Sequence, residues 1–472
     1  RVILTGSWDT AALFRSWRSD RPLLAETSGK NAMISTPTAD LDLAVADLVH
    51  SAFGHAGQKC SAASLAILVG PVGRSKRFAR QLVDATRSLR VAWPGAPQAE
   101  VGPVIEKPQG KLAWALTQLE GEEKWLVEPR SLDESGRLWS PGIRVGVQPG
   151  SRTHREEFFG PVLGIMHAST LSEAIRMQNA VAYGLTAGLH TQDPADLALW
   201  LDEVQAGNLY VNRGITGAIV QRQPFGGWKR SSVGPGAKAG GPNYLIGLGS
   251  WRSRPRGKSS STLHLRGLDV KISGLIESAQ PSLDFDSFEW LRQAALSDAV
   301  AWDREFGQVR DVSQLGVERN LFRYRPLPVT VRAASDASLA AILRVVLAGI
   351  RSGADFFVSV PEGVPAGVRA ELGALEVPVA VESDAEWIER IRRPAPDATR
   401  VGRVRLIGGR DAVADLHRAL AEAVEGDPDL AVYDNEVTSA GRLELLPFVH
   451  EQAISITAHR FGTPDPWSAD VI

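Results

Sequence analysis

Residues 39–70 read ADLDLAVADLVHSAFGHAGQKCSAASLAILVG, and this stretch decides the fold class. Apolar residues recur at helical spacing over 39–53, close to an aspartate that can cap a helix. A turn rich in small residues follows over 54–63, and SLAILVG at 64–70 is an apolar run typical of a buried strand. Helix, turn and buried strand in this order predict one unit of an α/β protein.

The alternation of strands and helices continues on both sides of this stretch. VILT at 2–5 predicts a strand that ends at a Gly-Ser turn and is followed by a helix. Further on, the pattern predicts helices over 74–89 and 195–207 and a strand over 208–212. After a basic, serine-rich segment at 251–262, strands again alternate with helices from 327 onward, which predicts parallel strands in a Rossmann-like sheet. No G-x-G-x-x-G follows these later strands, which favours a structural role for that sheet.

The composition limits the classes of function. Hydrophobic residues make up 44% of the 472 and charged residues 22%, as in ordinary globular proteins. A net charge of −2 offers no basic field for nucleic acid or membranes, and no apolar run approaches the ~18–20 residues that span a bilayer. One cysteine excludes an internal disulfide, so we expect a cytoplasmic protein. The chain starts on a strand without methionine, which favours a piece of a longer protein.

Cys60 is the only cysteine, and its neighbours suggest chemistry. A lone cysteine is ordinarily a small buried apolar residue. Here Gly57 permits close backbone approach, Lys59 is a cation that favours thiolate, and small residues follow the thiol. His55 raises the alternative of a Cys–His hydrolase, although such pairs are normally distant in sequence. The nine histidines show no metal-ligand spacing, so we expect no metal site.

Three other stretches contain candidate residues. Glu26 in LLAETSGKNAMI ends an apolar run, and it is either a satisfied core acid or a general base. REEFFGPVLGIM at 155–166 joins two carboxylates to two aromatic residues and a turn. TGAIVQRQPFGGWKRSSVGPGAKAGGPNYL at 216–245 has a glycine density that requires tight turns and an accessible backbone.

In combination, these motifs resemble the aldehyde dehydrogenase family. T-G-S, E-x-x-G-K-N, G-Q-K-C, E-E-x-F-G-P-V and P-F-G-G occur in this order between residue 1 and about residue 250. GHAGQKCSAAS, TGAIV and KAGGPNYL look like the glutamate-γ-semialdehyde (1-pyrroline-5-carboxylate) dehydrogenases. NLFRYRP at 320–326 and the residues 453–472 look like the end of the bifunctional proline utilisation A family.

The resemblance implies a role for nine residues. Cys60 would be the nucleophile and Glu26 the general base. The nicotinamide end of NAD would contact Gly6, Ser7, Glu157 and Phe159. The substrate carboxylate would be held by Ser61 and the backbone N–H groups of Gly217 and Ala218. Ser28 departs from the family's usual glycine, and its role stays open.

The resemblance also implies an organisation in domains. Residues 1–26 would end a truncated NAD-binding Rossmann domain, and residues 27–250 would form the three-layer α/β/α catalytic domain. A linker over 251–262 would lead to a Rossmann-like C-terminal domain at 263–472, without an NAD-binding fingerprint. A proline dehydrogenase domain with FAD would precede Arg1, and any contact with a membrane surface would belong to that domain.

The implied reaction is NAD-dependent oxidation of L-glutamate γ-semialdehyde to L-glutamate, in a homo-oligomeric enzyme of proline catabolism. The preference for NAD over NADP follows from the family alone. Two alternatives stay open. In the first, the chain is a non-catalytic module that seals a channel or mediates assembly. In the second, it is an aldehyde dehydrogenase for another substrate.

Overall fold

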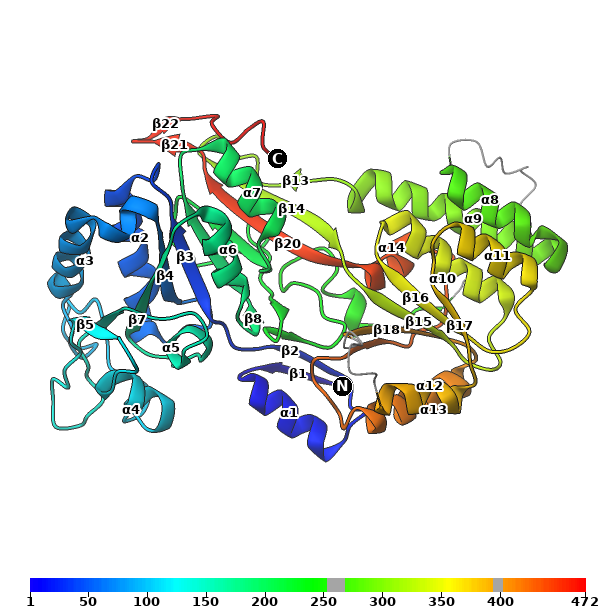
Figure 1. The fold of residues 1–472 in the computed structure, drawn as a ribbon, viewed down its shortest axis with the longest axis horizontal. Coiled ribbons are helices and arrows are strands. Elements are labelled where there is room, and N and C mark those ends of the chain that lie inside the picture. The colour runs from blue at the N-terminus through cyan, green and yellow to red at the C-terminus, as the bar shows by residue number, and fades with distance from the viewer. Residues whose placement is uncertain (253–267, 394–401) are drawn as a thin grey trace.

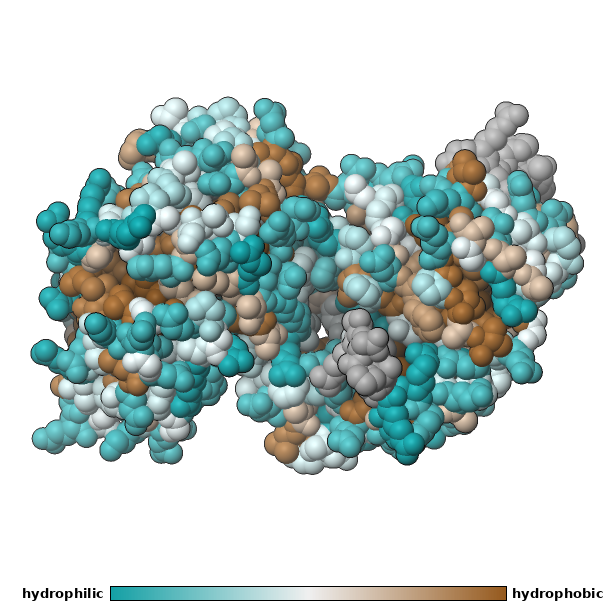
Figure 2. Space-filling view, viewed as in Figure 1, coloured by the Kyte–Doolittle hydropathy of each residue, from teal (hydrophilic) through white to brown (hydrophobic). Residues whose placement is uncertain are grey.

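The computed structural model describes residues 1–252, 268–393 and 402–472, so most of the predicted linker at 251–262 lies outside the described residues. The described chain is a mixed α/β structure with two lobes (Figure 1). Two long strands, β14 (Glu318–Pro326) and β20 (Val449–Thr457), run from one lobe to the other. The face drawn in Figure 2 is hollowed between the two lobes.

The first lobe is built on a large sheet that is ten strands wide in the described residues. Across the sheet, the strands are β13 (Arg310–Asp311), β14, β20, β10 (Asn208–Val211), β9 (Thr186–His190), β3 (Asn31–Ser35), β4 (Ala63–Val69), β7 (Val162–Ala168), β6 (Gly142–Val145) and β5 (Lys124–Val127). The strands from β20 to β6 are parallel, and β13, β14 and β5 pair antiparallel at the two edges.

Helices cover both faces of this sheet. One face packs against α2 (Leu41–Phe53) and α3 (Lys76–Ser88), and the other against α6 (Leu171–Asn179) and α7 (Pro194–Glu203). Along β3, Met33 joins the apolar cluster of α2 and α3, whereas Ala32 and Ile34 join that of α6 and α7. Successive side chains of a strand point to opposite faces, so β3, in which all five residues are buried, is covered on both sides. The result is the three-layer α/β/α arrangement that the resemblance implies.

The remaining elements of the first lobe are short. Two helices, α4 (Gly110–Thr117) and α5 (Arg152–Arg155), lie near β5 and β6, and a 3₁₀ turn over Gly54–Gly57 follows α2. A small sheet joins β1 (Val2–Thr5), β2 (Leu23–Glu26) and β12 (Ser232–Val233), next to α1 (Trp8–Trp17). Two further pairs are β8 (Tyr183–Gly184) with β11 (Trp228–Lys229), and β21 (His459–Arg460) with β22 (Thr463–Pro464).

The second lobe contains a parallel, Rossmann-like sheet. Its strands follow the order β17 (Val379–Val381), β16 (Phe356–Val360), β15 (Val329–Ala333), β18 (Arg403–Ile407) and β19 (Ala431–Tyr433). The helices around it are α8 (Val270–Ala279), α9 (Phe285–Ala301), α10 (Leu339–Ser352), α11 (Ala366–Ala374), α12 (Asp384–Arg392), α13 (Arg410–Ala423) and α14 (Gly441–Glu444). Apolar clusters lie on both faces, as the alternating sequence pattern predicts.

The sheets do not follow the domain limits that the sequence suggests. β20 pairs in parallel with β10, with Asn208 opposite Ala453, so residues after 263 contribute to the sheet of the first lobe as well as to their own. β12, from the predicted catalytic domain, likewise pairs with β2, with Ser232 opposite Glu26. An unpaired strand edge exposes backbone donors and acceptors, and each pairing satisfies such an edge. None of the described helices is both long and apolar enough to cross a bilayer.

Candidate active site

Cys60 lies in the turn that leads into β4, and hydrogen bonds from Asn31 hold the backbone of this turn. The side-chain Nδ2 of Asn31, at the start of β3, donates to the carbonyl oxygens of Cys60 at 2.7 Å and Ala62 at 2.9 Å. Oδ1 of Asn31 accepts from the backbone N–H of Thr186 at 3.0 Å. The cysteine is only half-buried. A reachable thiol on a clamped turn is what a nucleophile requires, and a packed apolar cysteine would have neither property.

A second contact brings the turn of Cys60 to the E-E-F-F-G segment. His55, Ala56 and Gly57 all have positive φ, and a Cβ on Gly57 would lie 2.2 Å from the carbonyl oxygen of Gly160. Only glycine allows the two backbones to approach this closely. Nε2 of Gln58 then donates to the carbonyl oxygen of Phe159 at 3.1 Å. The role of Gln58 and Asn31 as clamps was not predicted from the sequence, although both stand inside the quoted motifs.

Glu157 lies beside the cysteine as a result. Its Oε1 accepts from the backbone N–H of Gly29 at 2.9 Å. Burial raises the pKa of Glu157, and the hydrogen bonds from Gly29 and Ser28 oppose that rise. Phe159, two residues on, has a positive φ of 56° and a half-buried side chain. The buried Ser28, which stands where the family usually has glycine, therefore has a hydrogen-bond partner in Glu157.

Glu26 approaches Cys60 from the end of β2. Its Oε2 accepts a long hydrogen bond of 3.4 Å from the backbone N–H of Gly227. Burial raises the pKa of Glu26 to about 8, while the positive charge of Lys238 acts against the rise. A carboxylate with a pKa near neutrality can both accept and release a proton under ordinary conditions, as a general base must.

The thiol is surrounded by negative groups. Burial raises the pKa of Cys60 above its ordinary value, and the charges of Glu157 and Glu26 raise it further. The expectation that Lys59 favours the thiolate is therefore wrong, since the groups that act on the thiol are the two carboxylates and nearby backbone N–H groups. In this state the sulfur is a thiol, and it needs a base to accept its proton.

Gly6 and Ser7 lie next to Glu26 through strand pairing. Thr5 is opposite Glu26, and the backbone N–H of Gly6 donates to the carbonyl oxygen of Glu26 at 3.1 Å. Oγ of Ser7 accepts from the backbone N–H of Thr10 at 3.1 Å and so caps α1. These two residues thus border the same part of the site, with the hydroxyl of Ser7 engaged in the cap.

The predicted carboxylate-binding residues are found in two places. Ser61 is buried directly after the cysteine, and its carbonyl oxygen accepts from the hydroxyl of Thr186 at 3.2 Å. Gly217 and Ala218 lie in an exposed loop after β10, where Gly217 has a φ of 83° and a Cβ would meet nothing within 4 Å. The loop is open enough for backbone donors to meet a ligand, and its approach to Ser61 stays a prediction.

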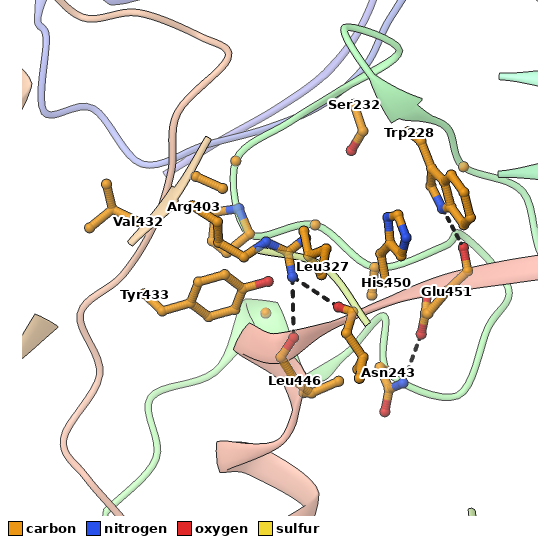
Figure 3. A pocket seen from close by; sticks show the side chains of 18 of the residues that line it. Trp228, Ser232, Asn243, Leu327, Arg403, Val432, Tyr433, Leu446, His450 and Glu451 are labelled. Atoms are coloured by element: carbon orange, nitrogen blue, oxygen red, sulfur yellow. Dashed lines mark hydrogen bonds between the residues drawn. The ribbon is translucent and has the colours of Figure 1, made fainter. Parts of the chain in front are cut away.

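A cavity of about 850 Å³ reaches Glu26 from the second lobe. Its wall combines the loop around Gly227 and Trp228 with Arg403, Tyr433 and His450 (Figure 3). The guanidinium of Arg403 donates to the backbone oxygens of Leu446, Pro447 and Val449. Residues on both sides of the predicted linker therefore shape the space behind the candidate base. In the described part of the chain, no group of three or more ligating side chains is placed to hold a metal ion.

A substitution at Gly29 tests how tightly the turn of Cys60 is packed. A methyl group at this position would lie 2.4 Å from the carbonyl oxygen of Cys60 and 2.8 Å from Oδ1 of Asn31. We expect Gly29→Ala to lower the free energy of unfolding by about 1–3 kcal/mol, since the clamp must shift. Urea denaturation measures the change. Gly54→Ala is the matched control, because a Cβ there meets nothing within 4 Å, and equal losses in both variants would contradict the expectation.

A family model described as the aldehyde dehydrogenase family matches residues 1–247, more than half of the 472-residue chain. The chain therefore belongs to the aldehyde dehydrogenase family.

Comparison with individual proteins shows which members of the family the chain is similar to. The chain is similar to the solved structure of proline utilization A (PutA) from Corynebacterium freiburgense, with 43% identity and a TM-score of 0.79, over 98% of this chain and 42% of that one. It is also similar to proteins named 1-pyrroline-5-carboxylate dehydrogenase. That of Bacillus subtilis (strain 168) is 39% identical and that of Geobacillus sp. (strain WCH70) 38% identical, each over 48% of this chain and 43% of the relative. The chain thus spans less than half the length of these proteins.

Proposed function

We propose that this chain is the catalytic part of an L-glutamate γ-semialdehyde dehydrogenase (EC 1.2.1.88), an NAD-dependent enzyme of proline catabolism. One observation carries the proposal: a half-buried cysteine on a clamped turn, with the carboxylates of Glu26 and Glu157 both acting on its thiol. The likeness to PutA and to 1-pyrroline-5-carboxylate dehydrogenases supports the choice of substrate. The likeness to PutA also supports a bifunctional whole, with an FAD-containing proline dehydrogenase part preceding Arg1.

Cys60 is the nucleophile in this proposal. The thiol loses its proton to Glu26, and the sulfur attacks the aldehyde carbon to form a thiohemiacetal. The developing oxyanion meets the backbone N–H of Cys60, a residue whose carbonyl oxygen accepts from Nδ2 of Asn31. Loss of hydride from the same carbon converts the adduct to a thioester on Cys60. The small residues that follow the cysteine leave room for the substrate on one side.

Glu26 first releases the proton of the thiol to solvent and then acts a second time, in the hydrolysis of the thioester. The ionised carboxylate accepts a proton from water, which attacks the acyl carbon, and the thiol of Cys60 leaves with L-glutamate as product. With a pKa of about 8, Glu26 is mostly protonated at neutral pH and becomes mostly ionised only above pH 8. We therefore expect the rate of hydrolysis to rise with pH through this range.

The residues present fit the nicotinamide end of NAD. The half-buried carboxylate of Glu157, fixed by Gly29, suits ribose hydroxyls, and the half-buried ring of Phe159 offers an apolar surface beside it. Gly6 and Ser7 border the same region from β1. When bound, NAD supplies the acceptor for the hydride. The chain's own residues hold the ribose and keep the reacting carbon next to Cys60.

Selectivity for a substrate with a carboxylate tests the proposal. Ser61 and the backbone N–H groups of Gly217 and Ala218 would hold the α-carboxylate, and an alkyl aldehyde would leave these donors unpaired. At about 1 kcal/mol for each unpaired donor, the lower end of the usual range, the three donors together correspond to about 10²-fold in kcat/KM. We therefore expect the full-length protein to reduce NAD about 10² times more efficiently with the semialdehyde than with propanal. Equal rates would favour an aldehyde dehydrogenase for another substrate.

The C-terminal half has a second role in this proposal. Arg403, Tyr433 and His450 close one side of the cavity that reaches Glu26, which favours a covering function for this part of the chain. A cover of this kind keeps an aldehyde intermediate away from bulk water. The enzyme would work as a cytoplasmic homo-oligomer.

A further inference from the structure

Lys238 is buried directly behind the candidate base. Its Nζ donates to Oδ1 of Asn208 at 2.9 Å and to the carbonyl oxygen of Gly226. A Cβ built on Gly226 would lie 3.1 Å from Oε1 of Glu26 and 3.2 Å from Cγ of Lys238. The carboxylate of Glu26 and the stem of Lys238 therefore lie beside the same glycine, which has no side chain to separate them.

Strand β20 of the C-terminal half fixes this lysine from the other side. Oε2 of Glu451 accepts from the backbone N–H of Lys238 at 2.6 Å, and Oε1 accepts from Nδ2 of Asn243 at 2.7 Å. The carbonyl oxygen of Glu451 accepts from Nε1 of Trp228 at 2.8 Å (Figure 3). The ring of His450 stacks on that of Trp228, with centroids 3.6 Å apart. One strand thus holds the loop 227–243 at both ends.

The charges around Glu26 come from three elements. The positive charge of Lys238 lowers the pKa of Glu26 against the effect of burial, and the negative charge of Glu451 raises it. Burial lowers the pKa of Lys238 to about 8, and Glu451 and Glu26 oppose that shift. Cys60 faces Glu26 from the turn before β4, and His450 faces Lys238 from β20 with its pKa far below the ordinary value. Among these groups, Lys238 is the one whose charge favours an ionised Glu26.

We propose that Lys238 is a positioning residue, whose buried ammonium keeps Glu26 ionised often enough to act as the base. This inference rests on the proposed function. Lys238 opens the KAGGPNYL motif, but the motif does not show an effect on Glu26, which requires β2, the loop 227–243 and β20 to meet. Without the ammonium, desolvation and the charge of Glu451 would act on Glu26 unopposed by any positive group, and its ionised fraction at neutral pH would fall further.

The test is the pH dependence of turnover in the full-length protein with the semialdehyde and NAD. We expect Lys238→Met to move the midpoint of the rise in kcat to higher pH by at least about one unit. At pH 7 this lowers kcat by about tenfold, while kcat near pH 9.5 approaches that of the unmodified enzyme. KM for the semialdehyde changes less than kcat, because Lys238 does not touch the substrate. An unshifted midpoint would overturn the inference.

Two further variants separate the charge from packing. Lys238→Gln keeps a donor near Asn208 without the charge, so we expect the same shift as in Lys238→Met; a normal profile in Lys238→Gln would overturn the electrostatic role. Lys229→Met is the control, because Lys229 lies on the same loop and its Nζ donates to the carbonyl oxygen of Asn179 at 2.7 Å. Its midpoint should stay in place. Absence of semialdehyde oxidation in the unmodified protein would overturn the proposed function instead.

Discussion

Cys60→Ala is expected to abolish NADH formation from the semialdehyde, with a fall in kcat of about 10⁴-fold or more. The reason is chemical: both the thiohemiacetal and the thioester require the sulfur, and the sequence contains no second cysteine. NADH absorbance in the full-length protein measures the loss. Mass spectrometry of the unmodified protein, quenched during turnover, should find the acyl group on Cys60 and on no other residue.

The control for this variant is Ser64→Ala. Ser64 lies four residues beyond the cysteine, and its hydroxyl makes only a 3.4 Å hydrogen bond to the carbonyl oxygen of Asn31. Its replacement removes a similar volume from the same segment, and activity should persist. Undiminished NADH formation in Cys60→Ala would refute the nucleophile and favour the non-catalytic role, in which this chain covers or assembles another active site.

Glu26→Gln is expected to separate the two chemical steps. The amide cannot accept a proton from water, so kcat should fall by about 10²–10⁴-fold. Where the thiol loses its proton to water instead, a burst of NADH close to one equivalent should still form at high pH. The acyl adduct should then accumulate on Cys60, visible as an added mass. This pattern follows from a base that is needed most in the hydrolysis of the thioester.

Glu203→Gln provides the comparison for the loss of a carboxylate. Glu203 is exposed at the end of α7 and does not line the cavity, and its variant should turn over normally. If Glu26→Gln instead lowers the burst and the steady rate equally, Glu26 acts mainly on the thiol of Cys60. If it changes neither, Glu26 is a satisfied core acid and the assignment fails.

Much of the fold could be predicted from short stretches, because their signals are local. Asp40 caps α2 through the backbone N–H groups of Asp42 and Leu43, and Ser75 caps α3 through that of Phe78. The buried run at 64–70 is strand β4 with a shift of one residue. Capping and apolar periodicity depend on residues a few positions apart, so the sequence displays them directly.

Other features were predicted wrongly or not at all, because they depend on residues that are distant in the sequence. The helix predicted over 195–207 ends at Glu203, since Gly207 is drawn into backbone contact with Gly184. β14 and β20 join the sheet of the first lobe. Their local sequence does not show whether they belong to that sheet or to the sheet of the second lobe. Lys59 stands beside Cys60 in sequence, yet the pKa of the thiol is raised, first by burial and then by the charges of Glu157 and Glu26.

By itself, the sequence determined the α/β class, the family resemblance and the nine candidate residues, because helical spacing, strand runs and ordered motifs are written along one chain. Only the tertiary structure decided which charges meet. Lys238 and Glu451 lie 213 positions apart and are joined by a hydrogen bond, and their charges act on Glu26 because β2, a loop and β20 converge. Electrostatic energies depend on distance and burial in space. The ionisation of the base is therefore a property of the folded protein.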